Sequence, residues 1–226
     1  ALVGGHDSCL QLLVSSGADF EACRLDGSRV VAIAAEKGDK GCLRLLLDQG
    51  ACIDASDHAG NTAAMKALVR GHESCLQLLV SSGADVNAPN GDGWTAVLWA
   101  AAHGHGSCLQ IVAEVSADLD ARLPDGSTAV LLAAENGNSA GLRCLIERDA
   151  DLGAVDHRGN TAASRAVEGN GAPCGRLACL RILAEQGLMG ASELLAERGS
   201  DLEEQAVAAA MRREKEQREA VRRQRR

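Results

Sequence analysis

The stretch Asp57–Pro89, DHAGNTAAMKALVRGHESCLQLLVSSGADVNAP, recurs with variations along most of the chain. One glycine repeats every 33 residues, at Gly27, Gly60, Gly93, Gly126 and Gly159. A threonine stands two residues after each of the last four, and a Cys-Leu pair repeats at 9–10, 42–43, 75–76 and 108–109. A fixed period with two short apolar blocks per unit is typical of repeat arrays. We therefore interpret the chain as a stack of units in which each unit packs on its neighbours.

Two short helices are predicted in each unit. The threonine hydroxyl can cap the first helix, and a glycine ends it, at Gly38, Gly71, Gly104 or Gly137. The second helix carries the dense apolar stripe, for example Cys75, Leu76 and Leu79. A Gly-Ala-Asp loop at 83–85 then leads to the next Asp-x-x-Gly turn. We expect antiparallel helix pairs joined by hairpin-like loops.

Two motifs in each unit resemble those of the ankyrin-repeat family. The first is TAAMKA (62–67), TAVLWA (95–100), TAVLLA (128–133) and TAASRA (161–166). The second is GADVNA (83–88), SADLDA (116–121) and DADLGA (149–154). The resemblance covers about residues 1–187 and implies an all-α ankyrin-repeat solenoid. The Pro and His of the family signature are replaced throughout, which we expect to soften the start of each first helix.

The period divides the chain into units and a terminal segment. The predicted units are a half repeat 1–23, full repeats 24–56, 57–89, 90–122 and 123–155, and a fifth repeat 156–187 with an insertion at 170–174. Residues 188–226 are predicted to form a degenerate capping helix pair and a long charged helix, with a helix end at Gly199 and a new cap at Ser200-Asp201. Because residues 1–22 nearly repeat residues 67–88, the sequence opens midway along a first helix. We expect further repeats or a partner to cover that end.

The nine cysteines do not have the spacing of a disulfide framework. Cys9, Cys42, Cys75 and Cys108 are expected to form a column, roughly 8–10 Å apart as packed helices are. Bridged cysteines have Cα atoms closer than about 7 Å. We predict buried thiols in an intracellular reducing compartment, with the cytoplasm as the expected location and an organelle left open. Cys174 lies in the insertion and is the best candidate for an exposed thiol.

The formal charge of −8 is unevenly distributed. Residues 212–226 carry a net charge of +5, so the rest of the chain carries −13. The acidic body disfavours nucleic acid, and the tail lacks aromatic and long apolar residues, which disfavours a membrane. A solvated helical end is the simplest interpretation of the tail. The alternative is a protein contact through Arg212, Arg213, Arg218, Arg222 and Arg223. The sequence has no apolar run of 18 residues.

Catalysis and cofactor binding are not predicted. The nucleotide-binding G-x-x-x-x-G-K-[ST], the zinc-protease H-E-x-x-H and the hydrolase G-x-S-x-G motifs are all missing from the sequence. His103 and His105 lack a third and fourth metal ligand nearby, and the repeat explains His105 as a helix-start residue. Asn87 resembles the asparagine that ankyrin-directed hydroxylases modify, although a hydrogen-bonding role in its loop is the simpler interpretation.

The ankyrin resemblance also implies a binding surface, the concave face formed by hairpin tips and first helices. Carried over position by position, the candidate protein-binding residues are His58, Asn61, Lys66, Val69, Arg70, Asp92, Trp94, Trp99, Ala102, His103, Asp125, Ser127, Leu132, Glu135, Asn136, His157, Arg158, Asn160 and Arg165. Tryptophan is enriched at binding hot spots, so Trp94 and Trp99, both in one central unit, stand out. Local packing of the two rings is the alternative.

Three functions are compatible with these features. The favoured one is a non-catalytic scaffold that binds a partner protein on the concave face and takes no small-molecule substrate. A second is an accessory subunit of a larger complex, docked through its N-terminal face or its basic C-terminal helix. A third is the regulatory array of a larger enzyme. The identity of the partner does not follow from an array of this shape.

Overall fold

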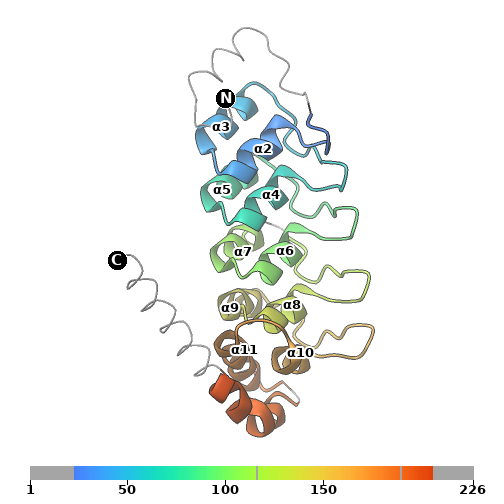
Figure 1. Ribbon diagram of the computed structural model, residues 1–226, viewed down its shortest axis with the longest axis vertical. Helices are drawn as coiled ribbons and strands as arrows, with labels where there is room; N and C mark the ends of the chain where they lie inside the picture. The colour runs from blue at the N-terminus through green and yellow to red at the C-terminus, as the bar shows by residue number, and fades with distance from the viewer. Residues whose placement is uncertain (1–22, 116, 189, 206–226) are drawn as a thin grey trace, which may run out of the picture.

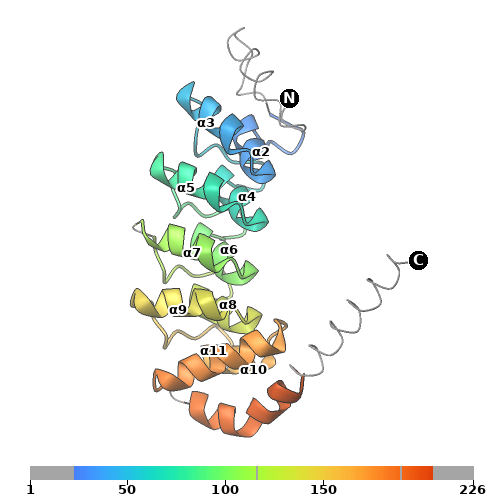
Figure 2. The ribbon, with the colours of Figure 1, turned by 90° about the vertical axis from the view of Figure 1, so that its left-hand side faces the viewer.

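The computed structural model describes residues 23–115, 117–188 and 190–205, and its helices form two stacked columns (Figure 1). The inner column consists of α2 (Val30–Lys37), α4 (Ala63–Arg70), α6 (Ala96–His103), α8 (Ala129–Asn136) and α10 (Ala162–Glu168). The outer column consists of α3 (Lys40–Asp48), α5 (Glu73–Ser81), α7 (Gly106–Ala113), α9 (Ser139–Glu147) and α11 (Pro173–Glu185). Hairpin-like loops project from one side of the stack (Figure 1), and the turned view shows the helix pairs stacked one above another (Figure 2). The predicted all-α solenoid is confirmed.

Four inner helices end at the glycines predicted to stop them. Gly38, Gly71, Gly104 and Gly137 have φ angles between 70° and 75°, in the left-handed region that glycine enters without steric cost. The outer helix begins within two residues of each of these glycines. A single left-handed residue therefore reverses the chain and places each outer helix beside its inner partner.

The threonines at the starts of the inner helices differ in their hydrogen bonds. The hydroxyl of Thr62 accepts a bond from the Met65 backbone N–H at 3.4 Å, and Thr161 forms a reciprocal capping box with Ser164. Thr95 and Thr128 make no side-chain cap, and their hydroxyls are buried without a partner in the described part of the chain. The predicted threonine cap is therefore right for two helices and wrong for the other two.

Leucine fills the core between the columns. The largest fully buried side chains are Leu43, Leu46, Leu68, Leu76, Leu79, Leu98, Leu109, Leu131, Leu142, Leu145, Leu180 and Leu183. Three cysteines of the predicted column, Cys42, Cys75 and Cys108, are at most 1% exposed and are thiols. Cys174 is exposed, as predicted. Small thiols next to each leucine let adjacent outer helices approach closely while excluding water.

A ladder of side-chain hydrogen bonds joins successive loops on the outer side of the hairpins. The backbone N–H of Asp85 donates to Asp54 Oδ1 at 2.9 Å, and that of Asp118 donates to Asn87 Oδ1 at 2.8 Å. Asp120 accepts the same bond from Asp151 at 2.9 Å. The amide of Asn87 thus has the hydrogen-bonding loop role that the sequence favours.

The C-terminal end of the stack departs from the repeat. Helix α11 is 13 residues long and begins at Pro173, so part of the predicted insertion lies in the helix and not in the turn. The predicted helix end at Gly199 is wrong, because residues 191–205 are continuously helical. A glycine costs about 1 kcal/mol inside a helix. Ala191 and Leu202, which precede and follow Gly199 in this helix, are buried at 0% and 2% exposure. The packing of these two side chains outweighs the low helix propensity of glycine.

Several predictions fall on residues outside the described part of the chain. These are the half repeat up to residue 22, the thiol of Cys9, and the tail with Arg212, Arg213, Arg218, Arg222 and Arg223. Within residues 23–115, 117–188 and 190–205, no helix has the length and apolar character needed to cross a membrane.

Candidate functional site

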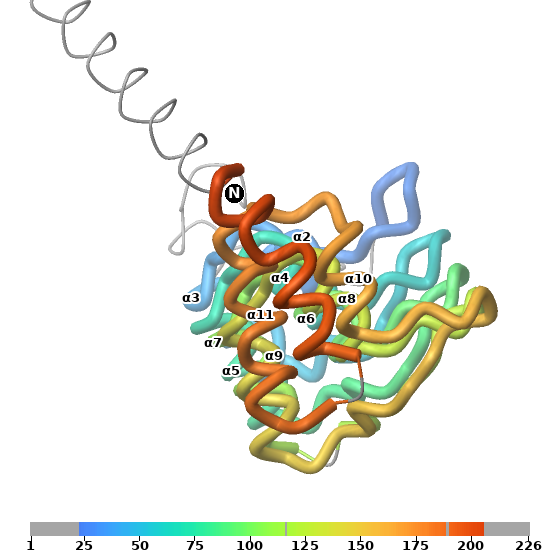
Figure 3. Tube along the Cα trace, turned by 90° about the horizontal axis from the view of Figure 1, so that it is seen from below, coloured from blue at the N-terminus to red at the C-terminus, as the bar shows by residue number. Residues whose placement is uncertain are grey.

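The inner helices and the hairpin loops together form one face of the solenoid, which we call the inner face. The view along the stack shows the hairpin loops extending past the inner helices on one side (Figure 3). Residues that stand 33 positions apart on successive inner helices share a register on this face: Lys66, Trp99, Leu132 and Arg165 form one such row. The row begins and ends with a cation and has apolar side chains in between, and the surface around it changes in the same way.

A hollow of about 230 Å³ lies between α4 and α6, and we call it the N-terminal hollow. Its lining residues are Glu36, Asn61, Met65, Lys66, Val69, Arg70 and Trp99. Lys66 Nζ lies 2.6 Å from Asp57 Oδ2, whose side chain is only 5% exposed. Arg70 Nη2 lies 3.0 Å from Glu36 Oε1, with the arginine side chain 58% exposed. The hollow therefore has an apolar floor with cations at its rim.

Three rings stack at the centre of the inner face. The ring centroids of Trp94 and Trp99 are 4.8 Å apart, and those of Trp99 and His103 are 4.7 Å apart. His103 Nδ1 lies 3.1 Å from the backbone oxygen of Trp99, which fixes the imidazole over the indole. Trp94 is half-buried against the core, and His103 is exposed. The two tryptophan rings therefore pack against each other, and the His103 ring beside them is exposed on the surface.

The indole N–H of Trp99 is shielded from water and has no acceptor in the described part of the chain. An unpaired buried donor costs roughly 1–3 kcal/mol. Such groups are rare in folded proteins. Trp99 therefore carries a local energetic cost at the edge of the N-terminal hollow.

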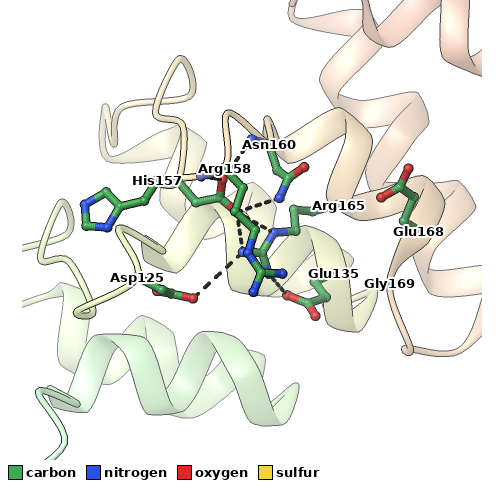
Figure 4. Close-up of a pocket in the computed structure, with 9 residues that line it drawn as sticks. Asp125, Glu135, His157, Arg158, Asn160, Arg165, Glu168 and Gly169 are labelled. Atoms are coloured by element: carbon green, nitrogen blue, oxygen red, sulfur yellow. Dashed lines mark hydrogen bonds and ion pairs between the residues drawn. The ribbon is translucent and has the colours of Figure 1, made fainter.

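A second hollow, of about 310 Å³, lies between α8, α10 and their hairpins, and we call it the C-terminal hollow (Figure 4). It is lined by Asp125, Glu135, Asp156, His157, Arg158, Asn160, Arg165, Glu168 and Gly169. Four carboxylates face two guanidinium groups, so the hollow is net acidic. No apolar side chain lines it, in contrast to the N-terminal hollow.

Arg165 occupies the centre of the C-terminal hollow (Figure 4). Its Nη2 atom lies 2.5 Å from Asp156 Oδ2 and 3.1 Å from Ser127 Oγ, and its Nη1 atom donates to Glu135. Asp125 is at 4.0 Å. All of these groups come from α8, α10 and their preceding hairpins, so the arginine ties two adjacent units together.

The pKa of the Asp156 carboxyl is held well below its ordinary value. Burial alone would raise this pKa, but hydrogen bonds from Arg165, from the Asn160 side chain and from the Asn160 and Arg158 backbones outweigh it. Burial likewise opposes a lowered pKa at Asp57, where Lys66 and Asn61 supply the stabilising bonds. Both aspartates are therefore ionised at neutral pH.

The clusters around Asp57 and Asp156 have the same arrangement and stand 99 residues apart. Asp57 and Lys66 correspond in register to Asp156 and Arg165, and each aspartate accepts a backbone bond from the asparagine four residues later at 2.8 Å. We call each aspartate–cation pair a hairpin clasp. The two units between them lack a clasp, because Trp99 and Leu132 occupy the cation's position. The inner face thus has a charged end, an apolar centre and a second charged end.

Most predicted contact residues lie at these sites. Asn61, Lys66, Val69, Arg70 and Trp99 line the N-terminal hollow, and Asp125, Glu135, His157, Arg158, Asn160 and Arg165 line the C-terminal one. His58, Asp92 and Asn136 are exposed away from both, and Ala102 is half-buried.

Two predicted contact residues are buried, and this is a correction. Ser127 is 1% exposed, with its hydroxyl held by Asp125 and Arg165, and Leu132 is 7% exposed within the core. Neither presents a surface to a partner. The sequence prediction missed Glu36, Met65, Asp156 and Glu168. The Asp-x-x-Gly-Asn spacing shared by the two clasps is the signal that would have found Asp156.

The described residues contain no group of three metal-ligating side chains. His105 stands at the N-cap position of α7, as the repeat predicts, and its side chain makes no capping hydrogen bond. His72, at the same register, contacts the Glu36 backbone oxygen with Nε2 at 3.0 Å. Both histidines therefore lie where one unit meets another.

The family model for ankyrin repeats (3 copies) matches residues 1–90, 55–122 and 97–192. The chain belongs to the ankyrin-repeat family. Among solved structures, this ankyrin array is similar to the ankyrin repeat domain of Bcl-3, described as a unique member of the IkappaB protein family. The two share 26% sequence identity with a TM-score of 0.70, over 83% of this chain and 84% of that one. No curated protein matches the sequence. Ankyrin repeats are generally protein–protein interaction modules.

Proposed function

We propose that this ankyrin array is a non-catalytic module that binds a protein partner across its inner face. The observation that carries the proposal is the stack of Trp94, Trp99 and His103 at the centre of that face, beside a hollow with an apolar floor. Large rings at the centre of a surface, surrounded by polar groups, have the composition of a binding hot spot. Val69, a large apolar side chain at the rim of this hollow, is 37% exposed.

The surrounding charges support a protein ligand. Arg70 and Glu36 form an exposed pair, which contributes little to folding stability. Their charges are therefore available to contact another molecule. The inner face also has charged groups at its two ends and apolar groups at its centre, which suits a ligand that is extended along the stack.

The proposal is tested by capturing partners from cells with the full chain and three variants. Val69→Asp places a charge in the hollow without removing a buried side chain, and Trp99→Ala removes the central ring. Arg44→Glu, at an exposed position on the outer helix α3, is the matched control. Hot-spot changes cost about 2 kcal/mol or more, which corresponds to roughly 30-fold weaker binding.

We expect the same partner to be captured by the parent and by Arg44→Glu and lost from both inner-face variants. Circular dichroism of each purified variant checks that the helices remain folded. Equal capture by all four proteins would reject the inner face as the binding surface. Two inner-face variants are used because Trp99→Ala also removes the ring contacts with Trp94 and His103, whereas Val69→Asp leaves those rings in place.

A further inference from the structure

The charge on the inner face changes sign along the array. Successive inner helices end in Lys37, Arg70, His103, Asn136 and, one position past α10, Gly169, which stand 33 residues apart. Cations are therefore confined to the N-terminal half of this row. The neighbouring row has Glu36 at its N-terminal end, where the carboxylate pairs with Arg70, and Glu135 and Glu168 at its C-terminal end.

The lining of the two hollows follows the same gradient. Two cations and one carboxylate line the N-terminal hollow, whereas four carboxylates and two guanidinium groups line the C-terminal one. Glu168 is exposed and has no ion pair among the described residues, and Asp125 is 62% exposed. These two carboxylates remain accessible although Arg165 neutralises part of the hollow.

On the basis of the proposed function, we propose that the inner face selects an extended peptide segment with a fixed order of charge. An acidic side chain of the segment lies over Arg70 and Lys37, and an apolar side chain enters the N-terminal hollow against Trp99. A basic side chain lies over Glu168 at the edge of the C-terminal hollow. Complementary potentials of this kind fix register and exclude wrong partners more than they raise affinity.

The spacing of the two hollows fits an extended chain. The N-terminal hollow lies between α4 and α6, and the C-terminal hollow lies two helices further on, between α8 and α10. Packed helices are roughly 8–10 Å apart, so the hollows are separated by about 16–20 Å. An extended peptide rises about 3.3 Å per residue. The apolar and basic side chains should therefore be about five or six residues apart.

Arg70 can turn to a ligand at small cost. Its bond to Glu36 at 3.0 Å is exposed, and exposed ion pairs contribute only about 0–1 kcal/mol. Lys66 differs, because Asp57 beneath it is nearly buried and holds it in the hairpin clasp. The clasp cations thus keep the hairpins in place, while the charges at the helix ends and on the loops contact the ligand.

The experiment measures binding of the full chain to five fluorescent 12-residue peptides of matched length. The first has an acidic end, a central leucine and a basic end, and the second has the reverse order, since the backbone direction of the ligand is open. The third has the same residues with charges alternating, and the fourth and fifth are the first and second with the leucine replaced by serine. Fluorescence anisotropy at low and high salt gives the affinities.

We expect one of the two ordered peptides to bind at least about tenfold more tightly than the alternating one, with the difference shrinking at high salt as exposed charges are screened. The serine peptides should bind more weakly than their leucine parents. Equal affinity of ordered and alternating peptides overturns the proposal, as does binding of none of them with Kd below about 1 mM.

Orientation is read with a photoreactive group at either end of the ordered peptide that binds. The basic end should crosslink within residues 125–169 and the acidic end within residues 36–70. The triple variant Lys37→Glu, Arg70→Glu, Glu168→Arg should exchange these two crosslinking sites, and Arg44→Glu should leave them unchanged. Crosslinks that do not depend on which end is labelled overturn the proposal. A dimer in light scattering that Val69→Asp dissociates also overturns it, because a second copy would then occupy the face.

The two proposals fail in different ways. If the cellular partner is lost from Val69→Asp and Trp99→Ala while charge order in the peptides has no effect, the inner face remains the binding surface and only the charge order is wrong. If capture of the partner is indifferent to both inner-face variants, the proposed function itself fails, whatever the peptides do.

Discussion

Arg165 donates two hydrogen bonds to a single carboxylate oxygen of Asp156, from Nε at 3.2 Å and from Nη2 at 2.5 Å. The same carboxylate also accepts the backbone N–H groups of two hairpin residues. One side chain therefore fixes the shape of the hairpin and its position on the inner helix that follows. The hairpin clasp at Asp57 and Lys66 repeats the arrangement near the other end of the array.

The first prediction concerns the pH dependence that the clasps impose. Because the pKa of both aspartates is lowered in the folded protein, their contribution to stability is complete above the unfolded value of about 3.9 and is lost as pH falls through the folded pKa. We expect Asp57→Asn and Asp156→Asn to unfold at lower urea than the parent at pH 7. The difference from the parent should begin to shrink at pH 3, because the carboxylates of the unfolded chain become protonated there while the lowered pKa keeps the Asp156 carboxylate of the folded protein ionised.

The control for this experiment is Asp92→Asn, at an exposed hairpin position outside both clasps. Its urea midpoint should match that of the parent at both pH values. A difference between the clasp variants and the parent that is the same at pH 7 and pH 3 would show that the loss comes from geometry and not from charge.

The second prediction separates two threonines that the sequence treats as equivalent. Thr161 accepts the Ser164 backbone N–H at 3.3 Å, and Ser164 Oγ accepts the Thr161 backbone N–H at 3.0 Å. Thr95 makes no such bond, and its hydroxyl is buried without a partner in the described chain. We expect Thr161→Ala to lower the free energy of unfolding by about 1 kcal/mol. Thr95→Val should be neutral or stabilising, because it removes an unpaired buried hydroxyl. Urea denaturation of the two variants measures both changes in the free energy of unfolding. A clear loss of stability for Thr95→Val would contradict the conclusion that the Thr95 hydroxyl has no partner.

The sequence predicts those parts of the fold that follow from strictly periodic residues. Gly71 and its equivalents could be assigned from spacing, because a left-handed helix end requires one residue type at one position. The buried leucines followed from the same period. Gly199 was misread because it stands outside the periodic region, where only the packing of Leu202 shows that the helix continues.

The candidate site was only partly predictable. Trp94 and Trp99 could be assigned to the inner face by register, but their stacking depends on side-chain rotation that spacing does not fix. Leu132 shares the register of Trp99 and was assigned to the surface on that basis. A register places a residue on a helix face, whereas neighbouring side chains decide whether that face is covered.

The third prediction concerns thiol reactivity. Burial raises the pKa of the Cys108 thiol to about 11 and that of Cys179 to about 12. The thiolate is the reactive form, so both should resist alkylation in the folded protein. Cys23, Cys52 and Cys174 are exposed and should react first. Iodoacetamide labelling followed by peptide mass spectrometry gives the order, and in urea all of them should react alike. Rapid labelling of Cys108 without urea would contradict its burial between the outer helices.

The fourth prediction concerns Arg176, which is 7% exposed and has no carboxylate within ion-pair distance in the described chain. Its Nη1 atom donates to the Val167 backbone oxygen at 2.7 Å, and its Nε atom donates to the Gly171 backbone oxygen at 3.0 Å. Both acceptors belong to the last turn of α10 and the segment after it. Burial lowers the pKa of the guanidinium, and the negative end of the α10 dipole offsets part of that cost.

Replacing this arginine should therefore loosen one end of the array and leave the rest intact. Arg176→Met keeps the apolar stem but removes both hydrogen bonds to the Val167 and Gly171 carbonyls, and hydrogen bonds to charged groups contribute about 1.5–3 kcal/mol each. Because units in a solenoid contact only their neighbours, hydrogen exchange should accelerate over residues 162–187 and stay unchanged over residues 63–81. Arg176→Lys, which can reach one carbonyl at a time, should show a smaller acceleration in the same segment. An equal acceleration in both segments would mean that the array unfolds as a single unit, and that the arginine supports the whole stack and not just its last helix pair.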